Sequence, residues 1–254
     1  MAKRELYADP TVKQVIFQIT YPNLFSLESK MGDFQTRIFE RFPQAALLYR
    51  RHFMVADLAP GANAEEFKRE EQAGKIFQFT SATKYVLSVQ SNSLDITSGY
   101  HKSYDLDDTK SFRHEIEFVL NHFLELFPLP SINRIGLRYI DRCPLSALNN
   151  DALSNNYNSA LPVGRFPVQD CDEMMINVVL KKGDLRLRYQ ESIRSDQEGL
   201  ALILDFDAFA LDTPANQYLE IADALHMLIY DEYEGTIREP IRKRMRQAGG
   251  LKNG

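Results

Sequence analysis

The order of apolar runs constrains this fold more than any other feature, because one pattern occurs twice. Three short strand-like runs followed by a long amphipathic helix span residues 76–127, and the same order returns at 173–234. A similar signal precedes each helix, Leu106-Asp107-Asp108-Thr109 in the first copy and Leu211-Asp212-Thr213 in the second. Three strands and one helix do not easily bury their own apolar faces, so the repeat predicts one paired structure with an internal duplication.

Both units are expected to be antiparallel, because the connections between their strands are only a few residues long. The predicted helices are 110–127, with Thr109 as N-cap, and 214–234, with Thr213 as N-cap and Pro214 at its first position. The predicted strands are 76–80, 85–90 and 94–98 in the first unit, and 174–180, 185–192 and 200–207 in the second.

The rest of the chain adds a strand at 12–20, a helix at 26–42 and strands at 47–55 and 134–142. The fold class that follows is α+β, with antiparallel sheet and helices packed on one face. We expect the two units to join edge to edge or face to face, in one chain or through a homodimer. The predicted parts are an α+β half (1–143), an Asn- and Ser-rich connection (144–170) and a second half (171–254), in one compact unit.

Net charge and hydropathy argue against some classes of function. The net charge of −5 over 254 residues argues against a protein whose main work is to grip duplex phosphates. No stretch reaches membrane-spanning length and the first residues do not resemble a signal peptide, so we expect a cytoplasmic protein without a membrane partner. In that compartment Cys143 and Cys171 are predicted to be reduced and structural.

Charged side chains alternate with apolar ones in three strands. Arg186 and Arg188 lie two apart in Leu-Arg-Leu-Arg-Tyr-Gln, and Arg134 and Arg138 lie four apart in another predicted strand. Asp205 and Asp207 follow the apolar run 200–204. Because alternate side chains share a face, Arg186, Arg188, Asp205 and Asp207 are candidates for one charged stripe if their strands pair, and Arg134 and Arg138 are candidates for a similar stripe.

Three interpretations of this stripe remain open. The first is a cross-strand ladder of ion pairs that only stabilises the sheet. The second is an arginine-lined concavity that binds a phosphate or carboxylate. The third is a metal-dependent phosphoesterase or nuclease in which Asp205 and Asp207 hold a cation while Arg186 and Arg188 stabilise phosphate charge.

Other candidates are weaker. The histidines lack the spacing of a zinc site and His226 lies on an apolar helix face, so we predict no metal, no cofactor and a packed histidine. A basic run near the C-terminus is typical of a solvated helix end, with nucleic-acid contact as the alternative. Its residues are Arg242, Lys243, Arg244 and Arg246.

The chain also resembles a sporadically distributed family of prokaryotic proteins of about this length. The similarity rests on Val15–Ile19, on the run Asn133–Arg142 with its Arg-Ile-Gly-Leu-Arg-Tyr core, and on Leu225-His226 with Gly235–Arg238. The resemblance implies an intact fold and brings no activity, cofactor or catalytic residue.

The leading functional expectation is a non-enzymatic binding or interaction protein, an accessory to an operon partner in a regulatory or defence setting. It follows from a sequence with no recognisable catalytic constellation. The alternatives are the phosphoesterase described above and a small-ligand carrier.

Overall fold

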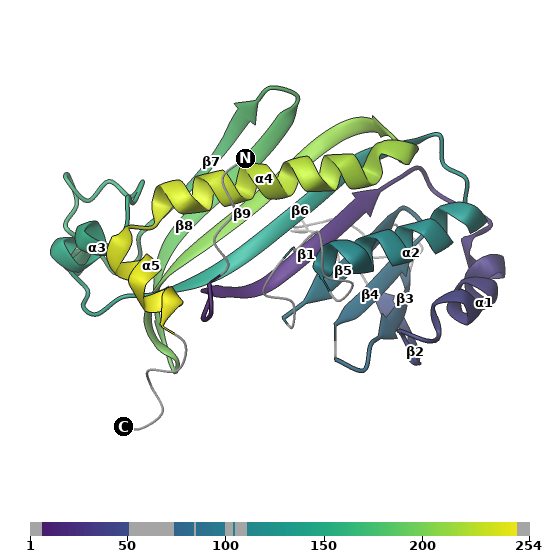
Figure 1. Ribbon diagram of the computed structural model, residues 1–254, viewed down its shortest axis with the longest axis horizontal. Helices are drawn as coiled ribbons and strands as arrows, with labels where there is room; N and C mark the ends of the chain where they lie inside the picture. Colours follow the sequence, from purple (N-terminus) through teal and green to yellow (C-terminus); the bar gives the residue numbers. More distant parts are fainter. Residues whose placement is uncertain (1–6, 51–73, 84, 100–103, 105–110, 248–254) are drawn as a thin grey trace, which may run out of the picture.

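The computed structural model describes residues 7–50, 74–83, 85–99, 104 and 111–247 (Figure 1). In these residues nine strands form one antiparallel sheet with the order β2-β3-β4-β5-β1-β6-β9-β8-β7. The strands are β1 (Val12–Thr20), β2 (Gln44–Arg50), β3 (Gly74–Thr80), β4 (Val86–Gln90), β5 (Ser93–Ser98), β6 (Ser131–Pro144), β7 (Met175–Lys182), β8 (Leu185–Asp196) and β9 (Gly199–Pro214).

The α+β class and the antiparallel sheet are confirmed, and the long helices cover one face. They are α1 (Leu27–Ile38), α2 (Phe112–Leu126) and α4 (Tyr218–Thr236), all lying in front of the sheet in Figure 1. Two shorter helices, α3 (Asn150–Asn156) and α5 (Glu239–Arg246), lie together at one end of the molecule. No helix of the described residues is long and apolar enough to cross a membrane.

The two halves of the sheet have similar strand orders, with one additional strand, β2, at the edge of the first half. β1 and β6 are neighbours at the centre, where β1 pairs with β5 and β6 pairs with β9. From there the meander β5-β4-β3 runs to one side and the meander β9-β8-β7 to the other. The first half therefore joins the second edge to edge within one chain. An origin by duplication of one unit stays a prediction.

Alternation along the central strands explains which face the helices cover. Val15, Phe17 and Ile19 of β1 are buried, whereas the residues between them are partly exposed. On the same face, the Tyr139 hydroxyl of β6 lies 2.9 Å from His226 Nδ1 of α4, and Phe206 of β9 contacts the Tyr233 ring of α4. From Ile135 onward the odd-numbered residues of β6, and from Leu202 to Ala210 the even-numbered residues of β9, thus face the helices.

The sequence predicted N-terminal ends for both α2 and α4. The N-cap of α2 is Ser111, whose Oγ accepts a hydrogen bond from the His114 amide at 3.3 Å; Thr109 lies outside the described residues. The predicted start at Pro214 is wrong, because α4 begins at Tyr218 after a 3-10 turn over 215–217. The reason is that pairing with β6 keeps β9 extended as far as Thr213 and Pro214.

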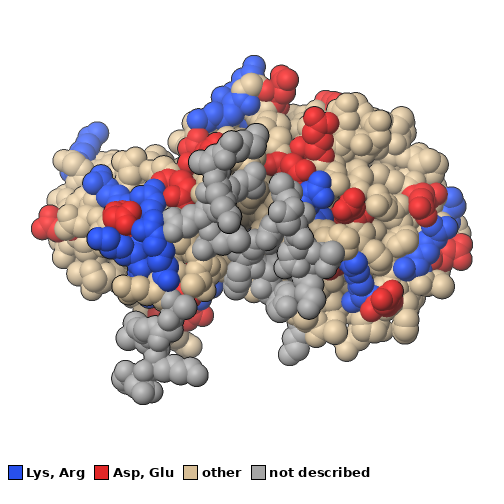
Figure 2. Space-filling model, viewed as in Figure 1, with Lys and Arg blue, Asp and Glu red and all other residues tan. Residues whose placement is uncertain are grey.

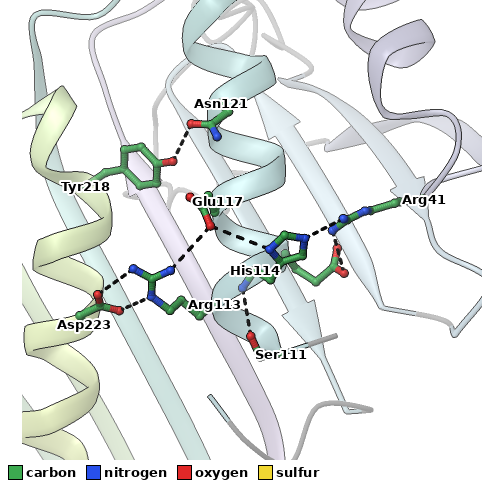
Figure 3. A network of polar contacts seen from close by, with 9 residues as sticks. Arg41, Ser111, Arg113, His114, Glu117, Asn121, Tyr218 and Asp223 are labelled. Carbon is green, nitrogen blue, oxygen red and sulfur yellow. Dashed lines mark hydrogen bonds and ion pairs between the residues drawn. The ribbon is translucent and has the colours of Figure 1, made fainter. Parts of the chain in front are cut away.

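Polar contacts hold the helices to one another (Figure 3). Arg113 of α2 donates to both carboxylate oxygens of Asp223 in α4, at 2.8 and 3.0 Å. The Tyr218 hydroxyl of α4 donates to Asn121 of α2 at 2.8 Å. A bidentate guanidinium–carboxylate pair fixes direction as well as distance, so it sets how α2 and α4 lie relative to each other.

The connection predicted at 144–170 is anchored to the sheet by a buried carboxylate. Glu191 of β8 is fully buried and accepts from the Tyr189 hydroxyl and the Ala160 amide, both at 2.8 Å, and from the Ser159 hydroxyl. A buried carboxylate needs such donors because it has lost its water. The connection therefore packs against the sheet and includes α3.

Candidate functional site

The six charged candidates lie on one face of the sheet, and all of them except Arg186 form ion pairs with one another. Arg188 pairs with Asp207 in the β8–β9 register, and Arg138 pairs with the same Asp207 across β6–β9. All six have the alternation opposite to that of the helix-facing residues, so they lie on the face that the long helices leave uncovered. We call this surface, made of Arg134, Arg138, Arg186, Arg188, Asp205 and Asp207, the open arginine face.

Arg138 is held by Asp205. Its Nε donates to Asp205 Oδ1 at 2.7 Å and its Nη2 donates to Oδ2, so the pair is bidentate. These hydrogen bonds raise the pKa of Arg138, and the Asp207 charge nearby adds to the effect. Asp205 is 14% exposed and Arg138 is 42% exposed, so the guanidinium still presents one edge to solvent.

The side chain of Arg134 lies over Gly136 of its own strand, β6. Its Nη2 donates to Asp207 Oδ1 at 2.6 Å, its Nη1 donates to Gln18 at 3.3 Å, and its guanidinium carbon lies 4.7 Å from the centre of the Phe209 ring. Gly136 makes this possible, because a Cβ there would lie only 2.2 Å from Arg134 Nη1. The glycine in Arg-Ile-Gly-Leu-Arg-Tyr therefore leaves room for the arginine before it.

The two arginines of β8 are bound much less tightly. Arg188 is 53% exposed and its Nη1 lies 3.8 Å from Asp207 Oδ2, too far for a hydrogen bond. Arg186 forms no ion pair with any described residue, and its Nη1 reaches only the carbonyl oxygens of Asp184 and Leu185. Four guanidinium groups thus share two carboxylates, and the excess positive charge is on β8.

The sheet is hollowed at this point. An open hollow of about 530 Å³ extends across four strands and is lined by Arg138 of β6, Asp205 and Asp207 of β9, Arg188 and Gln190 of β8, and Asn177 and Val179 of β7. Guanidinium and amide groups in its wall supply hydrogen-bond donors for an oxygen-rich ligand. The Arg134–Asp207 and Arg138–Asp205 pairs fit the predicted ladder, and the hollow beside them fits the predicted concavity, so both interpretations stay open.

The contacts of the two aspartates bear on the metal alternative. Both oxygens of Asp205 accept from Arg138, and Asp207 Oδ1 accepts from Arg134. A divalent cation at these oxygens would have to displace guanidinium groups of the same charge sign. Among the described residues no group of three or more His, Cys, Asp or Glu side chains is placed to hold a metal ion.

Sequence reasoning missed some residues of this site. Asn177 and Val179 point into the hollow because they alternate with Ile176, Val178 and Leu180. A single amide at the outward position of an otherwise apolar strand is the signal that would have identified Asn177. Phe209, in contrast, has no signal of its own, because it reads as one more apolar residue of β9.

The other sequence candidates lie apart from the open arginine face. His226 is packed as expected, 9% exposed, with its ring stacked 4.3 Å from that of Tyr104. Cys143 is fully buried, and this burial raises the pKa of its thiol, which keeps it protonated. Neither arrangement presents a reactive group to a substrate.

The basic run near the C-terminus forms α5, and Figure 2 shows basic side chains gathered over that helix. Acidic partners offset part of its charge. Arg242 donates to Glu234 at 3.0 Å and Arg246 donates to Glu239 at 2.7 Å. Nucleic-acid contact through Arg242, Lys243, Arg244 and Arg246 stays a prediction that these pairings weaken.

No protein-family model, curated protein or solved structure matches this chain.

Proposed function

We propose that this protein is a non-enzymatic interaction protein whose open arginine face binds a carboxylate-bearing segment of a protein partner. The observation that carries the proposal is the loosely held Arg188 in the wall of the hollow, with Arg186, which has no ion pair to any described residue, two positions away on the same strand. Arginine suits this role because its planar fork matches both oxygens of a carboxylate.

The tightly held arginines support the same proposal in another way. Arg134 and Arg138 are fixed by Asp207 and Asp205, and this leaves Arg188 with only a distant carboxylate. A guanidinium that lacks a close anion can bind an incoming one without first breaking a strong pair. The paired arginines thus form the floor of the site, and the exposed, weakly paired Arg188 beside them is the recognising group.

Acidic peptide is favoured over nucleic acid by overall charge. The chain carries −5, which repels a polyphosphate with one charge per nucleotide more strongly than a short peptide segment that brings only one or two carboxylates to the local arginines. An operon partner with an acidic surface segment fits this chemistry, in keeping with the accessory role expected from the sequence.

Two alternatives receive less support. A metal-dependent phosphoesterase needs Asp205 and Asp207 to hold a cation, and their oxygens already accept hydrogen bonds from arginines. A small-ligand carrier needs an enclosed cavity to bury its ligand, and this hollow is open along one side.

Affinity capture from the source cells tests the proposal. The tagged wild type is compared with the double variant Arg186→Ala/Arg188→Ala and with Arg194→Ala. Arg194 is the matched control, because it is an exposed arginine of the same strand whose partner in β9 is Ala201, whereas the partner of Arg188 is Asp207.

We expect a stoichiometric protein partner with the wild type and the control, and its loss with the double variant. Capture of nucleic acid, equal capture by all three proteins or no stoichiometric partner would contradict the proposal. Mg²⁺, Mn²⁺ and Zn²⁺ are tested in parallel by thermal shift. A stabilisation that disappears in Asp205→Asn would favour the phosphoesterase instead.

A further inference from the structure

The edge strand β2 is exposed on both of its faces. Every described side chain from Gln44 to Tyr49 is exposed, and β2 pairs with β3 along one edge only. The other edge strand, β7, behaves differently, since Ile176, Val178 and Leu180 of β7 are partly buried in strict alternation with exposed residues. β2 is therefore a strand without cover and β7 is a strand packed on one side.

The exposed side chains of β2 are mostly apolar. Leu47, Leu48 and Tyr49 are 45%, 42% and 58% exposed, and no residue from Gln44 to Tyr49 carries a charge. β7 instead ends in Lys181 and Lys182, and lysine at an edge disfavours pairing with another strand. An edge strand that is uncharged from Gln44 to Tyr49 and has a charge only at its last residue, Arg50, is a template for one more strand.

We infer that β2 pairs with β2 of a second copy and forms a symmetric dimer. The inference is independent of the open arginine face. A twofold axis perpendicular to the sheet makes the two strands antiparallel and keeps the helices of both copies on one side. Side chains opposite each other must then share a face, so only residues separated by an even number of positions pair.

One register uses the whole strand, with Leu47 on the axis. It places Leu47 opposite Leu47, Ala46 opposite Leu48 and Ala45 opposite Tyr49. Each small side chain therefore meets a large one, and no described charges are opposed, which is the complementarity that two copies of one strand need. The dimer would extend the antiparallel sheet continuously from one copy into the other.

Cysteine cross-linking tests this register in the full chain. Cys171, the more exposed of the two native cysteines, is first replaced by serine. Leu47→Cys then places two thiols opposite each other, with Cα atoms about 4.5–5.5 Å apart, inside the range that a disulfide needs. Leu48→Cys is the matched control, because its two Cα atoms would lie about 8 Å apart in the same register.

We expect oxidation to link the Leu47→Cys chains into dimers and to leave the Leu48→Cys chains mostly unlinked. Equal linking of the two variants, or linking of Leu48→Cys alone, would overturn the register.

Sedimentation measures the dimer itself in the absence of cross-linking. The wild type is expected to be dimeric. Leu47→Lys should be monomeric, because it opposes two like charges on the axis, while its circular dichroism spectrum stays that of the wild type. A wild type that is monomeric at every concentration would overturn the inference, and so would a folded Leu47→Lys that remains dimeric.

Discussion

The two faces of strands β6, β9 and β8 differ in how completely their side chains are bound. On the covered face Leu137, Phe206 and Leu187 are fully buried against the helices. On the open face Arg138 and Arg188 keep 42% and 53% of their side chains exposed. The covered face therefore stabilises the fold, and the open face retains hydrogen-bonding capacity. This division is possible because alternate side chains of a strand point to opposite faces and the helices cover only one of them.

The largest expected effect is on the covered face. Phe206→Ala removes a fully buried ring that packs against Tyr189 and Tyr233. We expect the free energy of unfolding to fall by about 3–5 kcal/mol, because a cavity forms where the ring was. Urea denaturation measures the loss. A cost below about 1 kcal/mol would mean that the covered face is not the core.

Alkaline pH should also weaken the covered face. Burial raises the pKa of Tyr218 from 10.0 to about 12, and it raises the pKa values of Tyr85, Tyr189 and Tyr233 as well. Above pH 10 the unfolded chain loses phenolic protons that the folded chain keeps, so the free energy of unfolding falls as pH rises. The tyrosinate absorbance of these buried tyrosines, obtained by difference from their Tyr→Phe variants, should appear together with loss of circular dichroism.

A signal from these buried tyrosines that rises near pH 10 in a chain that stays fully folded would contradict this prediction; exposed tyrosines such as Tyr49 do not bear on it.

The tightly held pairs of the open face should matter less for stability. Asp205→Asn removes the charge that Arg138 binds but keeps an oxygen acceptor in the same position. Because Arg138 is 42% exposed, we expect a cost of about 1 kcal/mol or less. Thermal denaturation at low and high salt measures it, and the difference from the wild type should shrink as salt rises. A loss as large as that of Phe206→Ala would erase the contrast between the faces.

The smallest stability change is expected at Gly136. A methyl group there meets the guanidinium of Arg134, a flexible end that can swing away. Gly136→Ala should therefore change the free energy of unfolding by less than about 1 kcal/mol, because no packed side chain is lost. It should still separate Arg134 from Asp207, which a crystal structure of the variant would show. An Arg134–Asp207 contact that persists would contradict this account of the glycine.

Local patterns predicted much of the sheet and part of the site. Alternation identified β8 with Arg186 and Arg188, and β9 with Asp205 and Asp207, because the period of a strand depends only on neighbours in sequence. The order of the strands did not follow from such patterns. The pairing of β1 with β6 joins residues more than a hundred positions apart, and only tertiary packing selects it.

The start of α4 also depends on tertiary structure, which local sequence patterns do not show. Thr213 and Pro214 carry the local signal of a helix N-terminus, and the partner strand β6 overrides it. Gly136 is a further case, because its role depends on where the side chain of Arg134 lies. Chemistry that one strand carries can be predicted, whereas chemistry that depends on a neighbouring strand requires the coordinates.

The most direct test of the open arginine face is to observe its guanidinium groups while an acidic peptide is added. The Nε–Hε resonances of the arginines report this by NMR, with a glutamate-rich peptide as the probe and its glutamine counterpart as the control. The account predicts that the signals of Arg186 and Arg188 shift with the glutamate peptide alone, while that of Arg194 stays in place. Shifts confined to the arginines of α5, or equal shifts with both peptides, would contradict it.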